Sequence, residues 1–364
     1  MLSQGKEPRI YIVQRMGISR GKGIFFRLLA VLAALCTGGI FLWVLGYPAI
    51  GVYQTMISGS FGSAMSFKEM IKLAIPLCIT SLGVTLAFKM KFWNIGAQGQ
   101  MGAGAIAASF FAYQFSYWPS GILLPAMLIS GIIVAGLWGM IPAYFKTKFG
   151  TNETLFTLMM NYIVINFIQF LQEGPWKDPT ALGFPIMPRF EKSARVPMVF
   201  GIHIGWIFAL VLTIAVFIYL KGTKQGYELS VVGENIVTAQ YAGMPVKKIV
   251  LRTMFLSAGI CGLAGVLQAS GADKMLTTTI GDSAGFPSVT IAWLAQLAPF
   301  AILIVSLLFG VLEKGCRTIE STYKISPAVA DVFQGIILFF VLGSEFFIRY
   351  KISFRKNNRG GMKK

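Results

Sequence analysis

A chain of 364 residues that is 55% hydrophobic and only 13% charged, with a mean hydropathy of +0.68, lies outside the balance of a soluble globular protein. The net charge of +18 does not point to nucleic acid, because the basic residues flank apolar segments and form no basic face with interleaved aromatics. The cysteines show neither metal-ligand spacing nor a disulfide pattern. The composition therefore indicates an integral membrane protein surrounded by membrane lipids.

Apolar windows recur along the whole chain. A helix needs about 20 apolar residues to cross about 30 Å of hydrocarbon. Windows near that length lie at 28–46, 70–88, 94–112, 121–143, 153–171, 203–220, 253–271, 298–313 and 328–348. The first is longer than the apolar core of a signal peptide and is expected to be retained. A further segment, 286–296, is too short to cross alone and is interpreted as a broken or half-depth helix. The sequence thus predicts an all-α polytopic bundle of about ten segments.

Charge placement predicts the topology of this bundle. An even number of segments leaves both termini on one side, and with the termini cytoplasmic most of the 32 Lys and Arg residues fall in cytoplasmic pieces. That distribution agrees with the positive-inside rule. The expected organisation is a basic cytoplasmic N-terminus at 1–27, a transmembrane domain at 28–348 with a cytoplasmic segment at 221–252, and a basic cytoplasmic tail at 349–364.

Small residues recur at a spacing of four in three of the predicted helices. Helices in lipid gain little from burying Leu against Leu, so close association needs small side chains that let backbones approach. The stripes are Gly131, Ala135, Gly139 and Ala143; Ser257, Cys261, Gly265 and Ala269; and Gly99, Ala103 and Ala107. They predict a compact helix bundle.

The stretch FWNIGAQGQMGAGAIAA, at 92–108, carries amides and glycines between two strongly apolar segments. Its glycines permit tight packing or a local break in a helix. Its amide side chains, Asn94, Gln98 and Gln100, would lie at membrane depth. Polar groups persist there only when they are buried in protein or line a wet cavity. This stretch is therefore a candidate wall of a substrate pathway.

Two further polar clusters lie in apolar surroundings. Glu153, Thr157 and Asn161 recur at a spacing of four and share one helix face, and Trp293 and Gln296 lie in the short segment. Buried amides also serve as hydrogen bonds between helices, worth about 1 kcal/mol each. Three such clusters in one chain favour a hydrogen-bonding passage, and both interpretations remain open for each residue.

The cytoplasmic segment 221–252 contains a short piece, ENIVTAQYAG, that can form a surface helix. Glu234 and Asn235 suit a helix start, and Gly243 suits a C-terminal cap. A surface helix rich in small residues can fit a groove on another protein. The alternative is an idle connecting loop.

Several chemistries are not supported by the sequence. No acid or base lies clearly at the centre of a span, where ion-coupled carriers commonly place one. No phosphate-binding G-x-x-x-x-G-K-[ST] loop is present. The single histidine, His203, lies at a predicted membrane interface and has no nucleophile or metal-ligand partner in the sequence. We find no catalytic constellation and no cofactor or metal motif.

Three motifs resemble the permease subunits of ATP-binding-cassette importers in the class that serves ribose, branched-chain amino acids and nucleosides, and most of all the nucleoside and simple-sugar permeases. FWNIGAQGQ is similar to the family stretch F-N-I-G-A-E-G-Q, and GTNETLFTLMMNY is similar to G-T-N-E followed by T-x-M-x-N-Y. GENIVTAQYAGM is similar to the segment that couples such permeases to their ATPase. The resemblance extends from about 70 to 348. Gln98 departs from the family's frequent glutamate, and Gln240 from its usual alanine.

The resemblance implies a non-enzymatic transport subunit in the plasma membrane of a bacterium. A second permease subunit, alike or different, would complete the path, an extracytoplasmic binding protein would deliver a nucleoside, and separate ATPase subunits would bind the ATP. The implied pathway residues are those of the three polar clusters. The implied coupling residues are Gly233, Glu234, Asn235, Ala239, Ala242 and Gly243.

Three alternatives stay open at this stage. A simple-sugar permease would share every motif described above. A stand-alone channel or ion-coupled carrier would work without an ATPase. A membrane enzyme is disfavoured, because the spans offer no nucleophile or metal-ligand set.

Overall fold

The computed structural model describes residues 10–14 and 20–354, and most of these residues are helical. The helices are α1 (Arg20–Val44), α2 (Ala49–Phe61), α3 (Ala64–Lys89), α4 (Ala97–Gln114), α5 (Ser120–Phe149), α6 (Glu153–Glu173), α7 (Gly205–Gly222), α8 (Lys224–Glu234), α9 (Ile236–Tyr241), α10 (Val246–Leu267), α11 (Gly285–Leu294), α12 (Pro299–Tyr323) and α13 (Pro327–Arg349). The shorter elements are the 3-10 turn η1 (Lys192–Ala194), the π-helical turn η2 (Gln268–Asp273), and the strands β1 (Ile10–Gln14), β2 (Met198–Val199), β3 (Ile202–His203) and β4 (Tyr350–Phe354).

The described helices make the chain a polytopic helical membrane protein. Seven of them are long and apolar enough to cross a membrane, namely α3, α5, α6, α7, α10, α12 and α13. The pair of α1 and α2, bent by 117° at its break, would add an eighth span. Every predicted window is occupied by a helix, but α4 falls outside the set of candidate spans and α11 has only 10 residues. The count of ten membrane segments stays a prediction.

Two helices extend well beyond their apolar windows. The predicted window 298–313 ends where Glu313, Lys314 and Arg317 begin, yet α12 continues to Tyr323. Likewise α10 begins at Val246, seven residues before its window. Lys, Arg and Glu are good helix formers, so charge ends an apolar window without ending the helix. No predicted apolar window covers α2, which lies between the first two windows.

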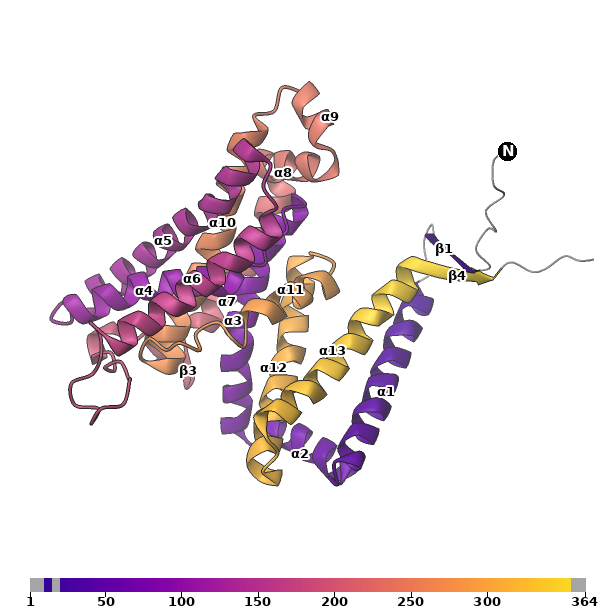
Figure 1. The fold of residues 1–364 in the computed structure, drawn as a ribbon, viewed down its shortest axis with the longest axis horizontal. Helices are drawn as coiled ribbons and strands as arrows, with labels where there is room; N and C mark the ends of the chain where they lie inside the picture. Colours follow the sequence, from indigo (N-terminus) through magenta and orange to yellow (C-terminus); the bar gives the residue numbers. More distant parts are fainter. Residues whose placement is uncertain (1–9, 15–19, 355–364) are drawn as a thin grey trace, which may run out of the picture. The chain divides into compact units, whose positions relative to one another are not determined.

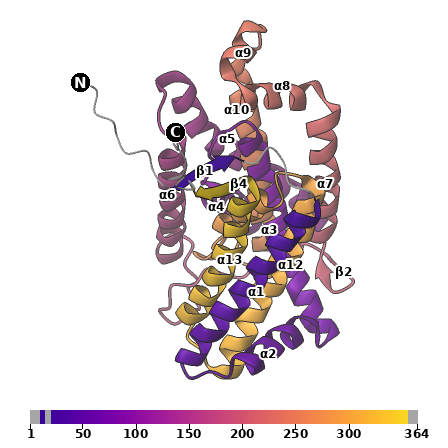
Figure 2. The same cartoon turned by 90° about the vertical axis from the view of Figure 1, so that its right-hand side faces the viewer.

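The chain divides into two compact units, Met1–Thr55 with Cys316–Lys364, and Met56–Gly315. In the first unit α1 and α13 lie side by side (Figures 1 and 2). Gly38 of α1 faces the ring of Phe333 on α13, and a methyl group added at Gly38 would lie 2.7 Å from that ring. Strands β1 and β4 pair antiparallel, with Ile10 opposite Phe354. The remaining residues of the two basic tails lie outside the described residues.

The second unit is built around α3 and α10, whose apolar windows are 83% and 72% buried. Hydrogen bonds link the two helices: Ser257 Oγ donates to the Gly83 carbonyl at 2.7 Å, and the Cys261 thiol lies 3.8 Å from the Thr80 carbonyl. Such bonds use small side chains that also let the backbones approach. Helices α4 and α5 complete the core, and α8 and α9 project beyond the end of α10 (Figures 1 and 2).

The predicted small-residue stripes lie at helix contacts: Gly131, Gly139 and Gly265 between α4, α5 and α10, Ser257 and Cys261 against α3, and Gly99 against α6. All of their members are buried except Ala107, which is half-buried. A methyl group added at Gly104 would lie 2.5 Å from the Gly262 carbonyl oxygen, and one added at Gly131 would overlap Val266. Gly265 likewise faces the Met101 carbonyl with no room for a side chain. The prediction of close backbone packing is confirmed.

We expect Gly104→Ala to lower stability by about 1–3 kcal/mol, because the new methyl group meets backbone atoms of α10 that cannot rotate away. Gly121→Ala on α5 is the matched control, since a methyl group there meets nothing within 4 Å. It should be neutral or stabilising by up to about 1 kcal/mol. Thermal unfolding of both variants in one detergent measures the difference, and equal midpoints would contradict the packing argument.

Candidate functional site

The start of α4 is an unusual helix terminus, because it lies buried inside the protein. Its N-cap is Gly96, which has no side chain to accept a hydrogen bond from the first turn. The preceding residue Asn94, fully buried, supplies part of the missing cap: its Oδ1 accepts from the Gly96 amide at 3.0 Å. Asn94 and Gln100 also exchange two side-chain hydrogen bonds, at 3.0 and 3.1 Å. The amides of this stretch therefore hold the helix start together.

Helix α6 supplies the rest of the cap. Asn161 Oδ1 accepts from the Gly99 amide at 2.8 Å, and its Nδ2 donates to the Ile95 carbonyl at 3.0 Å. Thr157 Oγ1 accepts from the Ile95 amide at 3.1 Å. The first amides of a helix have no partners within the helix, so these side chains replace the water that would satisfy them at a protein surface. We call Asn94, Gln100, Thr157 and Asn161 the amide clamp.

Glu153 lies on the same face of α6, at its first residue. Its carboxylate forms an ion pair with Lys146 of α5 at 2.8 Å, and the residue is 8% exposed. A carboxylate in the first turn interacts favourably with the helix dipole. Glu153 therefore lies on the same face of α6 as Thr157 and Asn161, as the spacing predicted. Its ion pair with Lys146 links α6 to α5.

Gln98 pairs with Asp282, which the sequence analysis did not identify as a candidate site residue. Its Nε2 donates to Oδ1 of Asp282, in the loop between η2 and α11. Gly281, at φ +79°, and Gly285 pack closely against Gln98, so this loop lies on the first turn of α4. Asp282 is the one charged residue between Lys274 and Glu313, close to the short apolar segment 286–296. An acid that stands alone in apolar sequence could have marked it as a candidate site residue.

Trp293 lies at the end of α11 and belongs to an aromatic cluster. Its ring stacks on Trp93, with centroids 5.5 Å apart and planes at 23°, and lies 5.7 Å from Phe88. The neighbouring Phe92 is only 4% exposed and is not available for stacking on a ligand. Gln296 is exposed in the turn after α11, where it and Leu297 both have positive φ, 53° and 56°.

The piece ENIVTAQYAG forms α9, which begins after Asn235 and ends just before Gly243. Asn235 caps its start, because its Oδ1 accepts from the Val237 and Thr238 amides at 2.8 and 3.2 Å. Ala242 ends the helix, and Gly243 follows with φ +73°, a conformation that favours glycine. Glu234 belongs to the preceding helix α8 instead. The helix is anchored by Ala239, which is fully buried.

The α8–α9 segment contacts the connection between α3 and α4. A side chain at Gly233 would overlap the Lys89 carbonyl, so the end of α8 rests directly on the backbone there. Lys91, at φ +56°, donates from Nζ to the Glu234 carbonyl at 3.3 Å. Both contacts lie within a few residues of Trp93 and Asn94. The projecting helix and the amide clamp are therefore joined through residues 89–94.

His203 is buried within the protein, just before α7. Its Nδ1 accepts from the Gly205 amide at 3.3 Å, and its Nε2 has no hydrogen-bond partner among the described residues. Burial, and to a lesser degree the charge of Lys72, lower the pKa of His203 to about 4. The residue is thus neutral at physiological pH. Within residues 10–14 and 20–354, no group of His, Cys, Asp and Glu side chains could hold a metal ion.

Apolar spans, buried amides and a projecting helix define a multi-pass helical membrane protein. The chain belongs to the family of the permease component of the branched-chain amino acid transport system, which matches residues 69–342.

Curated relatives match nearly the whole chain. The glucose ABC transporter permease protein TsgB13 of Haloferax volcanii is 28% identical over 91% of this chain and 90% of its own length. The guanosine ABC transporter permease protein NupP of Bacillus subtilis is 28% identical over 90% and 95%. The nucleoside ABC transporter permease protein NupB of Lactococcus lactis is 27% identical over 89% and 92%. The resemblance inferred from the motifs is confirmed at the level of the family.

We expect Asn161→Leu to destabilise the second unit. It leaves the Gly99 amide and the Ile95 carbonyl buried without partners, at about 1–3 kcal/mol each. The matched control is Asn166→Leu on the same helix, because Asn166 is exposed and bonds only the Tyr162 carbonyl one turn earlier. Thermal unfolding in detergent compares the two. An Asn161→Leu protein as stable as the wild type would show that the clamp does not support the fold.

Proposed function

We propose that the chain is a permease subunit of an ATP-binding-cassette importer that translocates nucleosides. The observation that carries the proposal is the match to guanosine and nucleoside permeases over about nine tenths of both chains. The glucose permease match, at the same identity, supports a simple sugar as the second candidate substrate.

The topology with ten segments and cytoplasmic termini belongs to this proposal. Pairing of β1 with β4 brings residues 10–14 and 350–354 together, which supports placing both ends of the chain on one side of the membrane. The segment 221–252 would then lie on that side as well. Relatives from Bacillus and Lactococcus support the plasma membrane of a bacterium as the location.

The α9 helix is the proposed docking point for a separate ATPase subunit. Ile236, Val237 and Tyr241 are 53%, 55% and 90% exposed, so apolar side chains project from a helix whose base is anchored by Ala239. Exposed apolar side chains that project together are typical of protein interfaces. Gly233, Glu234, Asn235, Ala242 and Gly243 would shape this contact. An extracytoplasmic binding protein and a second permease subunit complete the proposed assembly.

Residues 89–94 provide a route from the docking helix to the proposed pathway. A push on α9 would reach the Lys89 carbonyl through Gly233, and the Lys91 turn through Glu234. Beyond that turn lie the Trp93–Trp293 stack, which engages α11, and the amide clamp at the start of α4. Packed contacts of this kind carry rigid-body transitions, because close-packed interfaces do not deform continuously.

The pathway assignment of the polar residues is refined by their contacts. The amide clamp and Glu153 already pair within the chain, so we propose that they fix the shape of the pathway wall. Gln98 with Asp282, and the exposed Gln296 beside Trp293, would offer the donors, acceptors and ring face that a nucleoside requires. Asp282 places a carboxylate beside Gln98, the position at which the family stretch F-N-I-G-A-E-G-Q has glutamate.

The proposed substrate is tested by uptake into proteoliposomes that contain the full chain with its co-purified ATPase and binding protein. We expect ATP-dependent uptake of radiolabelled guanosine that excess adenosine reduces at least about tenfold, whereas excess glucose or ribose leaves it unchanged. Competition by glucose in place of adenosine would support the sugar permease. Uptake that persists with an inactivated ATPase would contradict the importer itself.

The docking assignment is tested at Gly243. A β-branched residue is strongly disfavoured at φ +73°, so Gly243→Val should unravel the end of α9 and lose the ATPase on gentle co-purification. Gly243→Asn is the matched control, because asparagine tolerates this conformation and should retain the ATPase. Both variants should reach the membrane at wild-type levels. Equal retention of the ATPase by Val and Asn would contradict docking at α9.

A further inference from the structure

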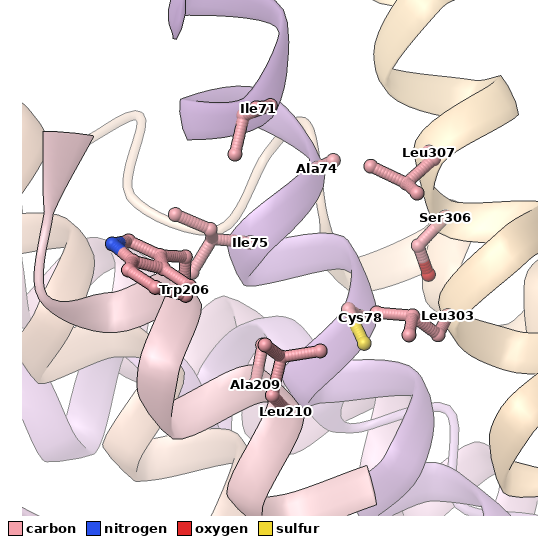
Figure 3. A pocket seen from close by; sticks show the side chains of 10 residues that line it. All are labelled: Ile71, Ala74, Ile75, Cys78, Trp206, Ala209, Leu210, Leu303, Ser306 and Leu307. Carbon is pink, nitrogen blue, oxygen red and sulfur yellow. The ribbon is translucent and has the colours of Figure 1, made fainter. Parts of the chain in front are cut away.

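A cleft of about 180 Å³ lies between α3, α7 and α12, away from the amide clamp. Figure 3 shows its lining side chains, which come from all three helices and converge on one space. They are Ile71, Ala74, Ile75, Cys78, Trp206, Ala209, Leu210, Leu303, Ser306 and Leu307. None carries a charge. A dry apolar cavity of about 150 Å³ already accepts benzene, so this cleft has room for a piece of hydrocarbon.

The rim of the cleft faces the surface that these helices present to lipid. Leu210 and Leu307 are 40% and 38% exposed, and their outward neighbours Val211 and Ile304 are 56% and 61% exposed. In a membrane-spanning helix, apolar side chains exposed in this way contact acyl chains. A hydrocarbon chain can therefore enter the cleft directly from the bilayer, without passing through water.

Positive charge lies at one end of the cleft. Lys68 and Lys72 precede and follow Ile71 on α3, and the spacing places them on the same side of the helix as Ile71 and Ile75. The Lys68 ammonium rests against Gly201, in the loop that leads into α7. The neighbouring Glu69 is engaged by Lys314. Two lysines therefore lie on the face of α3 that also carries the cleft residues Ile71 and Ile75.

Trp206 contributes the face of its ring to the cleft (Figure 3). Its indole Nε1 is buried and has no acceptor within the described part of the chain. Figure 3 shows this nitrogen on the edge of the ring turned away from Cys78 and Ser306, while the ring itself lines the cleft. Tryptophan at membrane interfaces typically has one apolar face and one donor directed at the headgroup region.

We propose that this cleft binds one anionic phospholipid, with an acyl chain between α3, α7 and α12 against the Trp206 ring, and with the phosphate beside Lys68 and Lys72. The apolar slot would hold the acyl chain, and the two lysines would attract the headgroup. Hydrogen bonds between ammonium groups and phosphate oxygens are charge-assisted and therefore stronger than neutral ones. The bound lipid would join α7 and α12 to the central helix α3.

The test measures lipids retained by the full-length protein, using native mass spectrometry after purification in mild detergent and titration with phosphatidylglycerol or phosphatidylcholine of identical chains. Wild type should retain phosphatidylglycerol in preference to phosphatidylcholine by at least about tenfold. Ala209→Phe should abolish retention by filling the slot. The pair Lys68→Gln and Lys72→Gln should weaken phosphatidylglycerol binding about tenfold while leaving the apolar packing intact.

Matched controls separate the cleft from the general lipid surface. Val211→Phe adds the same bulk on the lipid-exposed side of α7, and Lys221→Gln removes a charge from the opposite end of that helix. Both should bind phosphatidylglycerol as the wild type does. Equal binding of the two lipids, unchanged binding in the lysine pair, or competition by water-soluble glycerol phosphate alone would overturn the proposal.

Discussion

The structure depends on satisfying the backbone amides of a helix that begins inside the protein. At the start of α4 no water is at hand, and each unpaired amide in hydrocarbon would cost several kcal/mol. Asn94 from the same stretch and Asn161 from α6 replace that water. Because these bonds are made, α4 can begin inside the protein, and the connection between α3 and α4 can pass through the interior beside the α8–α9 segment. Glycine at 96 and 99 gives α6 the room to approach.

Close backbone contact is the second condition. Gly104 against Gly262, and Gly131 and Gly265 in the same layer, draw α4, α5 and α10 together. Dispersion grows as atoms approach, so small residues provide the attraction that apolar burial does not provide in lipid. The resulting core is rigid at its centre. Of the elements proposed to move, α9 projects beyond the end of α10 (Figure 1), and the 89–94 connection meets the α8–α9 segment at Gly233 and Glu234.

Composition and apolar periodicity were enough to predict a helical membrane bundle and the position of nearly every long helix, because lipid imposes length and hydropathy directly. Motif spacing also predicted α9 to within a residue. Contacts between distant segments were not predictable. The partner of Gln98 is Asp282, 184 residues away, and only the fold brings the two together. Likewise, spacing placed Thr157 and Asn161 on one face but did not indicate that the face would cap another helix. Helix α2 lacked an apolar window long enough to be noticed.

The amide clamp also constrains how the chain enters the membrane. Its two halves are 62 residues apart, and α5 lies between them. When α4 emerges during synthesis, the side chains that satisfy its first turn have not yet been made, and α4 is absent from the helices apolar enough to span alone. Helices α4, α5 and α6 are therefore expected to leave the insertion machinery for the bilayer as one group. A truncation after α5 would remove Asn161, so the first amides of α4 would have no hydrogen-bond partner from α6.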